Sequence, residues 1–145
     1  MGRPVRARWT MPRMSGPMCE LTAPVAVQLP NDGTAPGLAR RFLRSAVCAP
    51  HQAGVLDEAE LLTSELVTNA VRYGAPPMIV RVTCDRSRGL VVAVTDGSTQ
   101  PPAPRQAASD DDSGRGLQLV DLLSSDWGVQ ASSAGKTVWF ELRTK

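Results

Sequence analysis

A carboxylate and a carboxamide lie four residues apart in the most regular helical segment of the chain. Glu65 and Asn69 fall within residues 55–73, where apolar side chains recur at steps of three and four. Residues at this spacing share one face of a helix. The carboxylate can orient or deprotonate a hydroxyl group, and the amide oxygen suits Mg²⁺, which bridges substrate phosphates. Taken alone, a pair at this spacing more commonly belongs to a solvated helix face, with a hydrogen bond between the two side chains.

The predicted start of a later helix could hold an anion. It follows a long polar segment and has the sequence Gly114-Arg115-Gly116-Leu117. Glycine lets the backbone approach a ligand closely, and the free amides at a helix start attract phosphate. The same residues could form an ordinary loop-to-helix turn, and the nearby aspartates at residues 110–112 would repel a phosphate unless a metal or distance intervenes.

Polar residues at two strand ends form a third candidate group. Asp96 closes a strand predicted at residues 90–95 and precedes Gly97, and Thr137 opens the last strand. A carboxylate at a buried strand end can accept a hydrogen bond from the exocyclic amine of adenine, and a nearby hydroxyl could join it. An Asp-Gly pair is also a common turn, and an isolated threonine would indicate nothing.

The pattern along the chain predicts an α+β domain. Alternating apolar residues indicate strands at residues 25–29, 78–84, 90–95, 127–131 and 136–143. Helical spacing indicates helices at residues 35–47, 55–73 and 116–123. The sum is a two-layer sandwich in which about three helices cover one face of a mixed, mostly antiparallel sheet. One hairpin should bury five residues on a shared face: Val80, Val82, Leu90, Val92 and Val94.

Length and composition favour a single cytoplasmic domain. Residues 1–21 show no regular period and are expected to form a disordered or loosely attached extension before a domain at residues 22–145. No apolar segment there is long enough for a signal peptide or a membrane span. The net charge of +2 and the scattered basic residues give no footprint for nucleic acid. The only histidine, His51, is expected in a solvated loop.

Taken in order, four motifs resemble the Bergerat-type ATP-binding fold of the GHKL superfamily, which includes gyrase-type topoisomerases, heat-shock chaperones, histidine kinases and mismatch-repair ATPases. More closely, the set looks like the anti-sigma regulatory kinases related to RsbW and SpoIIAB. The motifs lie at residues 64–72 (SELVTNAVR), 94–96 (VTD), 114–117 (GRGL) and 135–140 (GKTVWF). Each motif is weak alone, but their order is specific.

This resemblance implies a role for each matching residue. Glu65 corresponds to the general base that prepares a serine hydroxyl, and Asn69 to the Mg²⁺ ligand. Asp96 corresponds to the carboxylate that reads adenine, with Thr137 as its supporting hydroxyl. Residues 97–113 would form a lid over ATP, hinged at Gly114 and Gly116. The nucleotide-binding set is completed by Arg72, Gly97, Arg115 and Leu117.

The resemblance also implies partners and leaves one alternative open. We expect a protein that binds Mg-ATP, phosphorylates a serine on a STAS-type anti-sigma antagonist and sequesters a sigma factor, with a homodimer compatible with the sequence. The alternative is a non-catalytic module whose nucleotide state controls partner binding. Ser98 and Gln100 stand where the broader superfamily has glycines. A phosphorylatable histidine before the domain is lacking, which disfavours a histidine kinase.

Overall fold

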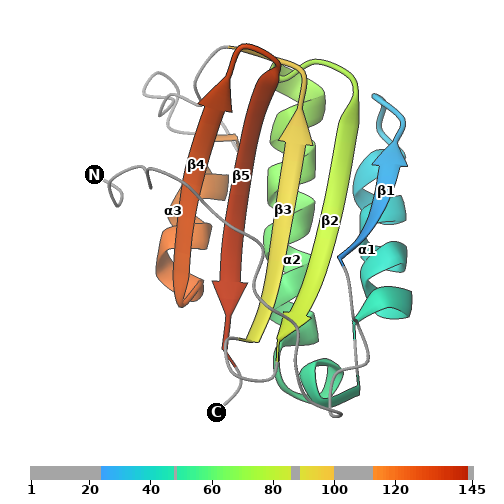
Figure 1. Cartoon of the computed structure of the whole chain (residues 1–145), viewed down its shortest axis with the longest axis vertical. Coiled ribbons are helices and arrows are strands. Elements are labelled where there is room, and N and C mark those ends of the chain that lie inside the picture. Colours follow the sequence, from blue (N-terminus) through green and yellow to red (C-terminus); the bar gives the residue numbers. More distant parts are fainter. Residues whose placement is uncertain (1–23, 48, 86–88, 100–112, 144–145) are drawn as a thin grey trace.

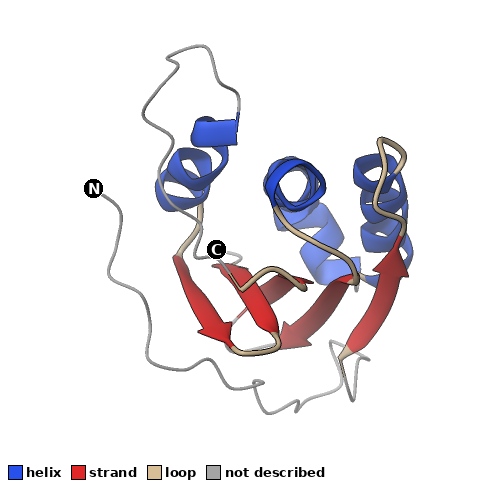
Figure 2. Ribbon diagram, turned by 90° about the horizontal axis from the view of Figure 1, so that it is seen from above, coloured by secondary structure: helices blue, strands red, loops and turns tan. Residues whose placement is uncertain are grey.

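Three helices pack on one face of a five-stranded sheet in the part of the chain that the computed structural model describes, residues 24–47, 49–85, 89–99 and 113–143 (Figures 1 and 2). The predicted extension at residues 1–21 lies outside this part. In chain order the elements are β1 (Val25–Leu29), α1 (Ala35–Ala46), α2 (Ala49–Tyr73), β2 (Met78–Asp85), β3 (Gly89–Asp96), α3 (Ser113–Leu123), β4 (Asp126–Ser132) and β5 (Gly135–Leu142).

The sheet has the strand order β1-β2-β3-β5-β4, and each of its four pairings is antiparallel. The predicted, mostly antiparallel sheet is confirmed, but the expectation that it would be mixed was wrong, since none of the pairings among the described strands is parallel. Two tight hairpins, β2–β3 and β4–β5, make neighbouring strands antiparallel. Since β4 takes the outer position, β5 returns beside β3 in the opposite direction.

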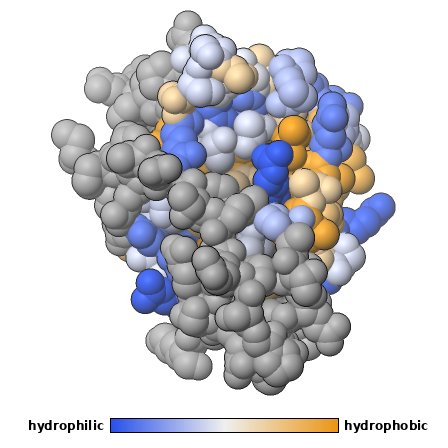
Figure 3. Space-filling model, in the orientation of Figure 1, coloured by the Kyte–Doolittle hydropathy of each residue, from blue (hydrophilic) through white to orange (hydrophobic). Residues whose placement is uncertain are grey.

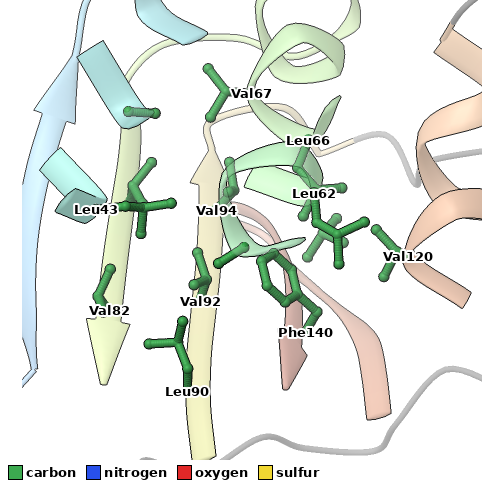
Figure 4. Packing of buried hydrophobic residues seen from close by; sticks show 14 of the residues in the cluster. Leu43, Leu62, Leu66, Val67, Val82, Leu90, Val92, Val94, Val120 and Phe140 are labelled. Atoms are coloured by element: carbon green, nitrogen blue, oxygen red, sulfur yellow. The ribbon is translucent and has the colours of Figure 1, made fainter. Parts of the chain in front are cut away.

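The buried face predicted for the β2–β3 hairpin is confirmed. Val80 lies opposite Val94, and Val82 lies opposite Val92, with all four side chains buried. Leu90 and Phe140 are buried on the same face. Figure 4 shows the labelled members of this set on the helix-covered side of the sheet, together with Leu62 of α2 and Val120 of α3. One hydrophobic core therefore joins the sheet to all three helices.

Helices α2 and α3 begin earlier than predicted. α2 starts at Ala49 rather than near Val55, so His51 lies within a helix and not in a loop. Pro50 fits the first turn of this helix, because the amide that proline lacks has no partner there. α3 starts at Ser113, which places Gly114 and Gly116 inside its first turns. None of the described helices is long and apolar enough to cross a membrane.

A shallow apolar groove lies between α1 and the edge strand β1. Its lining includes Val27 and Leu29 from the strand and Leu38 and Phe42 from the helix. Figure 3 shows hydrophobic residues gathering over this edge of the molecule. None of the residues predicted to form the functional site lines this groove.

Candidate functional site

The contacts of α2 with α1 fix which way its faces point. Arg44 of α1 forms an ion pair with Glu60, with 2.9 Å between Nε and Oε2, and the Arg40 guanidinium donates to the Ser64 hydroxyl at 2.9 Å. Counting about 100° per residue from Leu62, Glu60 and Ser64 lie at about 160° and 200° around the helix. That side of α2 therefore faces α1.

Glu65 and Asn69 lie on the opposite side of α2. By the same count they fall at about −60° and −20°, next to the core-facing stripe and away from α1. Because α2 stands between α1 and α3 (Figures 1 and 2), this side faces α3. Both side chains are half-buried, and neither forms a hydrogen bond or ion pair within the described part of the chain. The polar pair therefore does not point into bulk solvent.

Arg72 extends the same polar side of α2 by one turn. It falls at about −80° on the helical count and is exposed. Three positions that the sequence grouped together therefore share one side of one helix, since the periodicity of the helix dictates it. The side chains differ in burial, and only Glu65 and Asn69 lie at the rim of the core.

Asp96 lies at the end of β3 and is almost fully buried, with 4% of its surface exposed. Its Oδ1 accepts the backbone N–H of Ser98 at 2.7 Å. The Lys136 ammonium stands 3.0 Å from Oδ2 and 3.2 Å from Oδ1, and Lys136 is itself only 8% exposed. The two residues are cross-strand neighbours in the β3–β5 ladder. Asp96 is therefore held as one member of a buried ion pair.

The C-terminal end of α2 packs directly against this ion pair. A Cβ atom added to Gly74 would stand 2.7 Å from both Cγ and Oδ2 of Asp96. The Gly97 amide donates to the Ala75 carbonyl at 2.6 Å, and a Cβ atom on Gly97 would collide with the Pro76 carbonyl oxygen. Asn69 is five residues before Gly74, which is about 7.5 Å along a helix axis. The C-terminal part of α2 thus carries the Asn69 carboxamide, and its end adjoins the buried carboxylate of Asp96 on β3.

The structure does not bring Thr137 to Asp96. Thr137 lies opposite Thr95 in the ladder, and their hydroxyl oxygens are 2.8 Å apart. Both residues point to the face of the sheet away from the helices, because side chains alternate along a strand. The partner of Asp96 is Lys136, which the sequence reasoning missed. Its signal was the alternation itself, since Lys136 has the parity of buried Val138 and Phe140.

The glycine-rich motif begins α3 on the side of α2 that carries the polar pair. Leu117 is half-buried and packs against the hydrophobic core. The side chains of residues 113–116 and all of residues 100–112 lie outside the described part of the chain. The lid, its hinge and a role for Arg115 therefore stay predictions. The backbone of α3 does pack against α2.

Comparison with known proteins identifies the class. Residues 29–142 match the family described as the histidine kinase-like ATPase domain, which covers most of the chain. The chain therefore belongs to this family, and membership implies nucleotide binding. The α+β prediction is confirmed by the described elements and agrees with this class.

A solved structure gives the particular neighbour. The chain is similar to the crystal structure of the RsbU and RsbW domains of Rv1364c from Mycobacterium tuberculosis, with a TM-score of 0.62 and 19% identity. The match covers 85% of this chain and 32% of that one, so this chain spans about a third of the length of its neighbour. At this identity the likeness shows the fold alone. No match was found among curated protein sequences.

Proposed function

We propose that this protein binds Mg-ATP between α2 and α3 and phosphorylates a serine on a regulatory partner. The observation that carries the proposal is the arrangement along α2, where Glu65 and Asn69 face α3 and the buried Asp96 carboxylate adjoins the end of the same helix. Family membership supports nucleotide binding. The site would then be lined by the polar side of α2, the end of β3 and the first turns of α3.

The residues present fit a nucleotide with its metal. The absence of a side chain on Gly74 lets the backbone after α2 lie close to the Asp96 carboxylate, where a Cβ atom would collide. A carboxylate there can accept from the amine of adenine. The Asn69 amide oxygen would hold Mg²⁺, a cation that takes oxygen ligands and keeps several waters. The metal, when bound, would neutralise charge on the phosphates.

Glu65 would supply the base for phosphate transfer. One turn of helix separates it from Asn69, so a serine hydroxyl brought to the phosphates would lie near both side chains. The carboxylate would accept the proton of that hydroxyl as its oxygen bonds to the γ-phosphorus and the bond to ADP breaks. Catalysis would rest mainly on positioning and on charge neutralisation.

The partners that we propose follow from the motif resemblance. A STAS-type anti-sigma antagonist would carry the serine, and a sigma factor would be sequestered on a helical face. The fold of an RsbW domain in the similar structure supports a regulatory role of this kind. We further propose that the protein acts in the cytoplasm, without direct contact with nucleic acid.

The decisive variant is Glu65→Gln, which keeps the shape of the side chain and removes its basicity. ATP affinity, measured by titration calorimetry, should stay near that of the wild type, while transfer of labelled phosphate to a candidate antagonist should fall about a hundredfold or more. Asp57→Asn is the control, because Asp57 is exposed on a different side of α2. Equal rates of phosphate transfer by Glu65→Gln and wild type would exclude Glu65 as the general base. ATP binding without transfer to any antagonist would favour the non-catalytic switch.

A further inference from the structure

Lys136 is a buried charged residue next to Asp96, and it has no role in the proposed reaction. It is the cross-strand neighbour of Asp96, and both side chains lie on the helix-covered face of the sheet. An ammonium group has three N–H donors and no acceptor. Within the described residues, the hydrogen-bond partner of Lys136 is the Asp96 carboxylate, which it meets at 3.0 and 3.2 Å. At least one donor therefore stays available beside the carboxylate.

Protein groups already occupy part of the acceptor capacity of the Asp96 carboxylate. Oδ1 accepts from both Ser98 and Lys136, and Oδ2 forms an ion pair with Lys136. A carboxylate oxygen has two lone pairs, so Oδ2 has one acceptor position left. Oδ2 also lies against Gly74, whose backbone can come this close because the residue has no side chain. A ligand edge that reaches Oδ2 therefore also reaches the ammonium.

Purine bases differ at the position that such an edge would present. Adenine carries an amine at C6, which donates, whereas guanine and hypoxanthine carry an oxygen at C6, which accepts. A lone carboxylate would accept from the amine and repel the oxygen. An ammonium next to the carboxylate offers a donor for that oxygen, because the lysine side chain is flexible and its three donors rotate.

We propose that Lys136 is a specificity-determining residue, which lets the base-reading end of the pocket take 6-oxo purines as well as adenine. This inference rests on the proposed nucleotide site and adds its base selectivity. The Asp96–Lys136 pair thus offers an acceptor and a donor side by side. Wild-type protein should bind ITP within about tenfold of ATP, since each base finds a complementary group.

The test compares the ratio of the dissociation constants for ITP and ATP, both with Mg²⁺, in wild type and variants. ITP carries the 6-oxygen without the 2-amine of guanine, so the comparison isolates one position of the base. Lys136→Met removes the donor and keeps an apolar stem, and it should raise the ratio about tenfold or more. Lys136→Arg keeps a cation and should restore the ratio at least in part.

A second variant guards against misfolding. In Lys136→Thr the hydroxyl can donate its single proton to Asp96, which leaves the carboxylate hydrogen-bonded but provides no donor for the base. It should raise the ratio in the same direction. Arg41→Met is the matched control, because Arg41 is an exposed cation of α1, and its ratio should equal that of wild type.

The outcomes separate the inference from the proposed function. If wild type binds ATP and the Met and Thr variants, folded by thermal melting, keep its ratio, Lys136 has only a structural role and the inference fails alone. A wild type that already rejects ITP strongly would also overturn it. If wild type binds no purine nucleotide saturably, the proposed site and the inference fail together.

Discussion

Adding one methyl group at Gly74 should disturb the packing between the end of α2 and Asp96. In Gly74→Ala, the new Cβ atom would stand 2.7 Å from Cγ and Oδ2 of Asp96 and 2.8 Å from the Ala70 carbonyl oxygen. Carbon atoms in ordinary contact are about 3.5–4.0 Å apart, so the shortfall is roughly 0.7 Å or more. Asp96 cannot simply move away, because Lys136 and the Ser98 amide hold it.

The size of the effect follows from two opposing terms. Overpacking of this kind costs about 1–3 kcal/mol, whereas replacing glycine by alanine gains about 0.4–1 kcal/mol from the unfolded chain. The net loss in the free energy of unfolding should be about 1–2 kcal/mol. For a domain of this length that corresponds to a fall in Tm of roughly 3–8 °C. Nucleotide binding should weaken as well, since the carboxylate is displaced.

The matched control is Gly37→Ala in α1. A Cβ atom there would lie 3.6 Å from the nearest side-chain atom, Nη2 of Arg40, which is ordinary contact. Alanine is favoured over glycine in a helix by up to about 1 kcal/mol, so this variant should be as stable as wild type or more so. Urea denaturation with unchanged m-values gives both free energies. Equal stability of the two variants would refute the packing of α2 against Asp96.

Three further predictions test the site and the helix that supports it. Asn69→Ala should weaken ATP binding in the presence of Mg²⁺ and much less in its absence, and equal losses by calorimetry would contradict a metal role. Asp96→Ala should lower the free energy of unfolding by about 3–5 kcal/mol, because it leaves the buried Lys136 ammonium unpaired. The double variant Asp96→Asn with Lys136→Met should lose much less stability, and similar urea midpoints for the two proteins would refute this. Hydrogen bonds from Thr34 lower the pKa of Asp32, so its contribution is complete above the unfolded value of about 3.9 and is lost as the pH falls through the folded one. The difference in Tm between wild type and Asp32→Ala should therefore shrink below about pH 4, and a constant difference down to pH 2 would contradict it.

Local periodicity made the hairpins and their buried face predictable. The alternation that placed Val80 opposite Val94 needs only the two strands and the turn between them. The position of β5 beside β3 depends on contacts between segments that are far apart in sequence, and strand pattern alone does not encode it. The prediction of a mixed sheet failed for that reason.

The candidate site was predictable where a single helix defines it. Glu65 and Asn69 share a side of α2 because of their spacing, and the contacts of α1 then show which side this is. Motif order could not identify the partner of Asp96, because the motif assigns a role to Thr137 and none to Lys136, the residue before it. The register of β5 against β3 shows that Lys136, and not Thr137, lies on the face of Asp96, in agreement with the alternation of Lys136 with buried Val138 and Phe140.

The most direct measurement is a calorimetric titration of the wild-type chain with ATP, in Mg²⁺ and again with a chelator. One molecule of ATP should bind per chain with saturable heat, and removal of Mg²⁺ should weaken the binding. A titration with no saturable heat in Mg²⁺ would contradict a nucleotide site between α2 and α3.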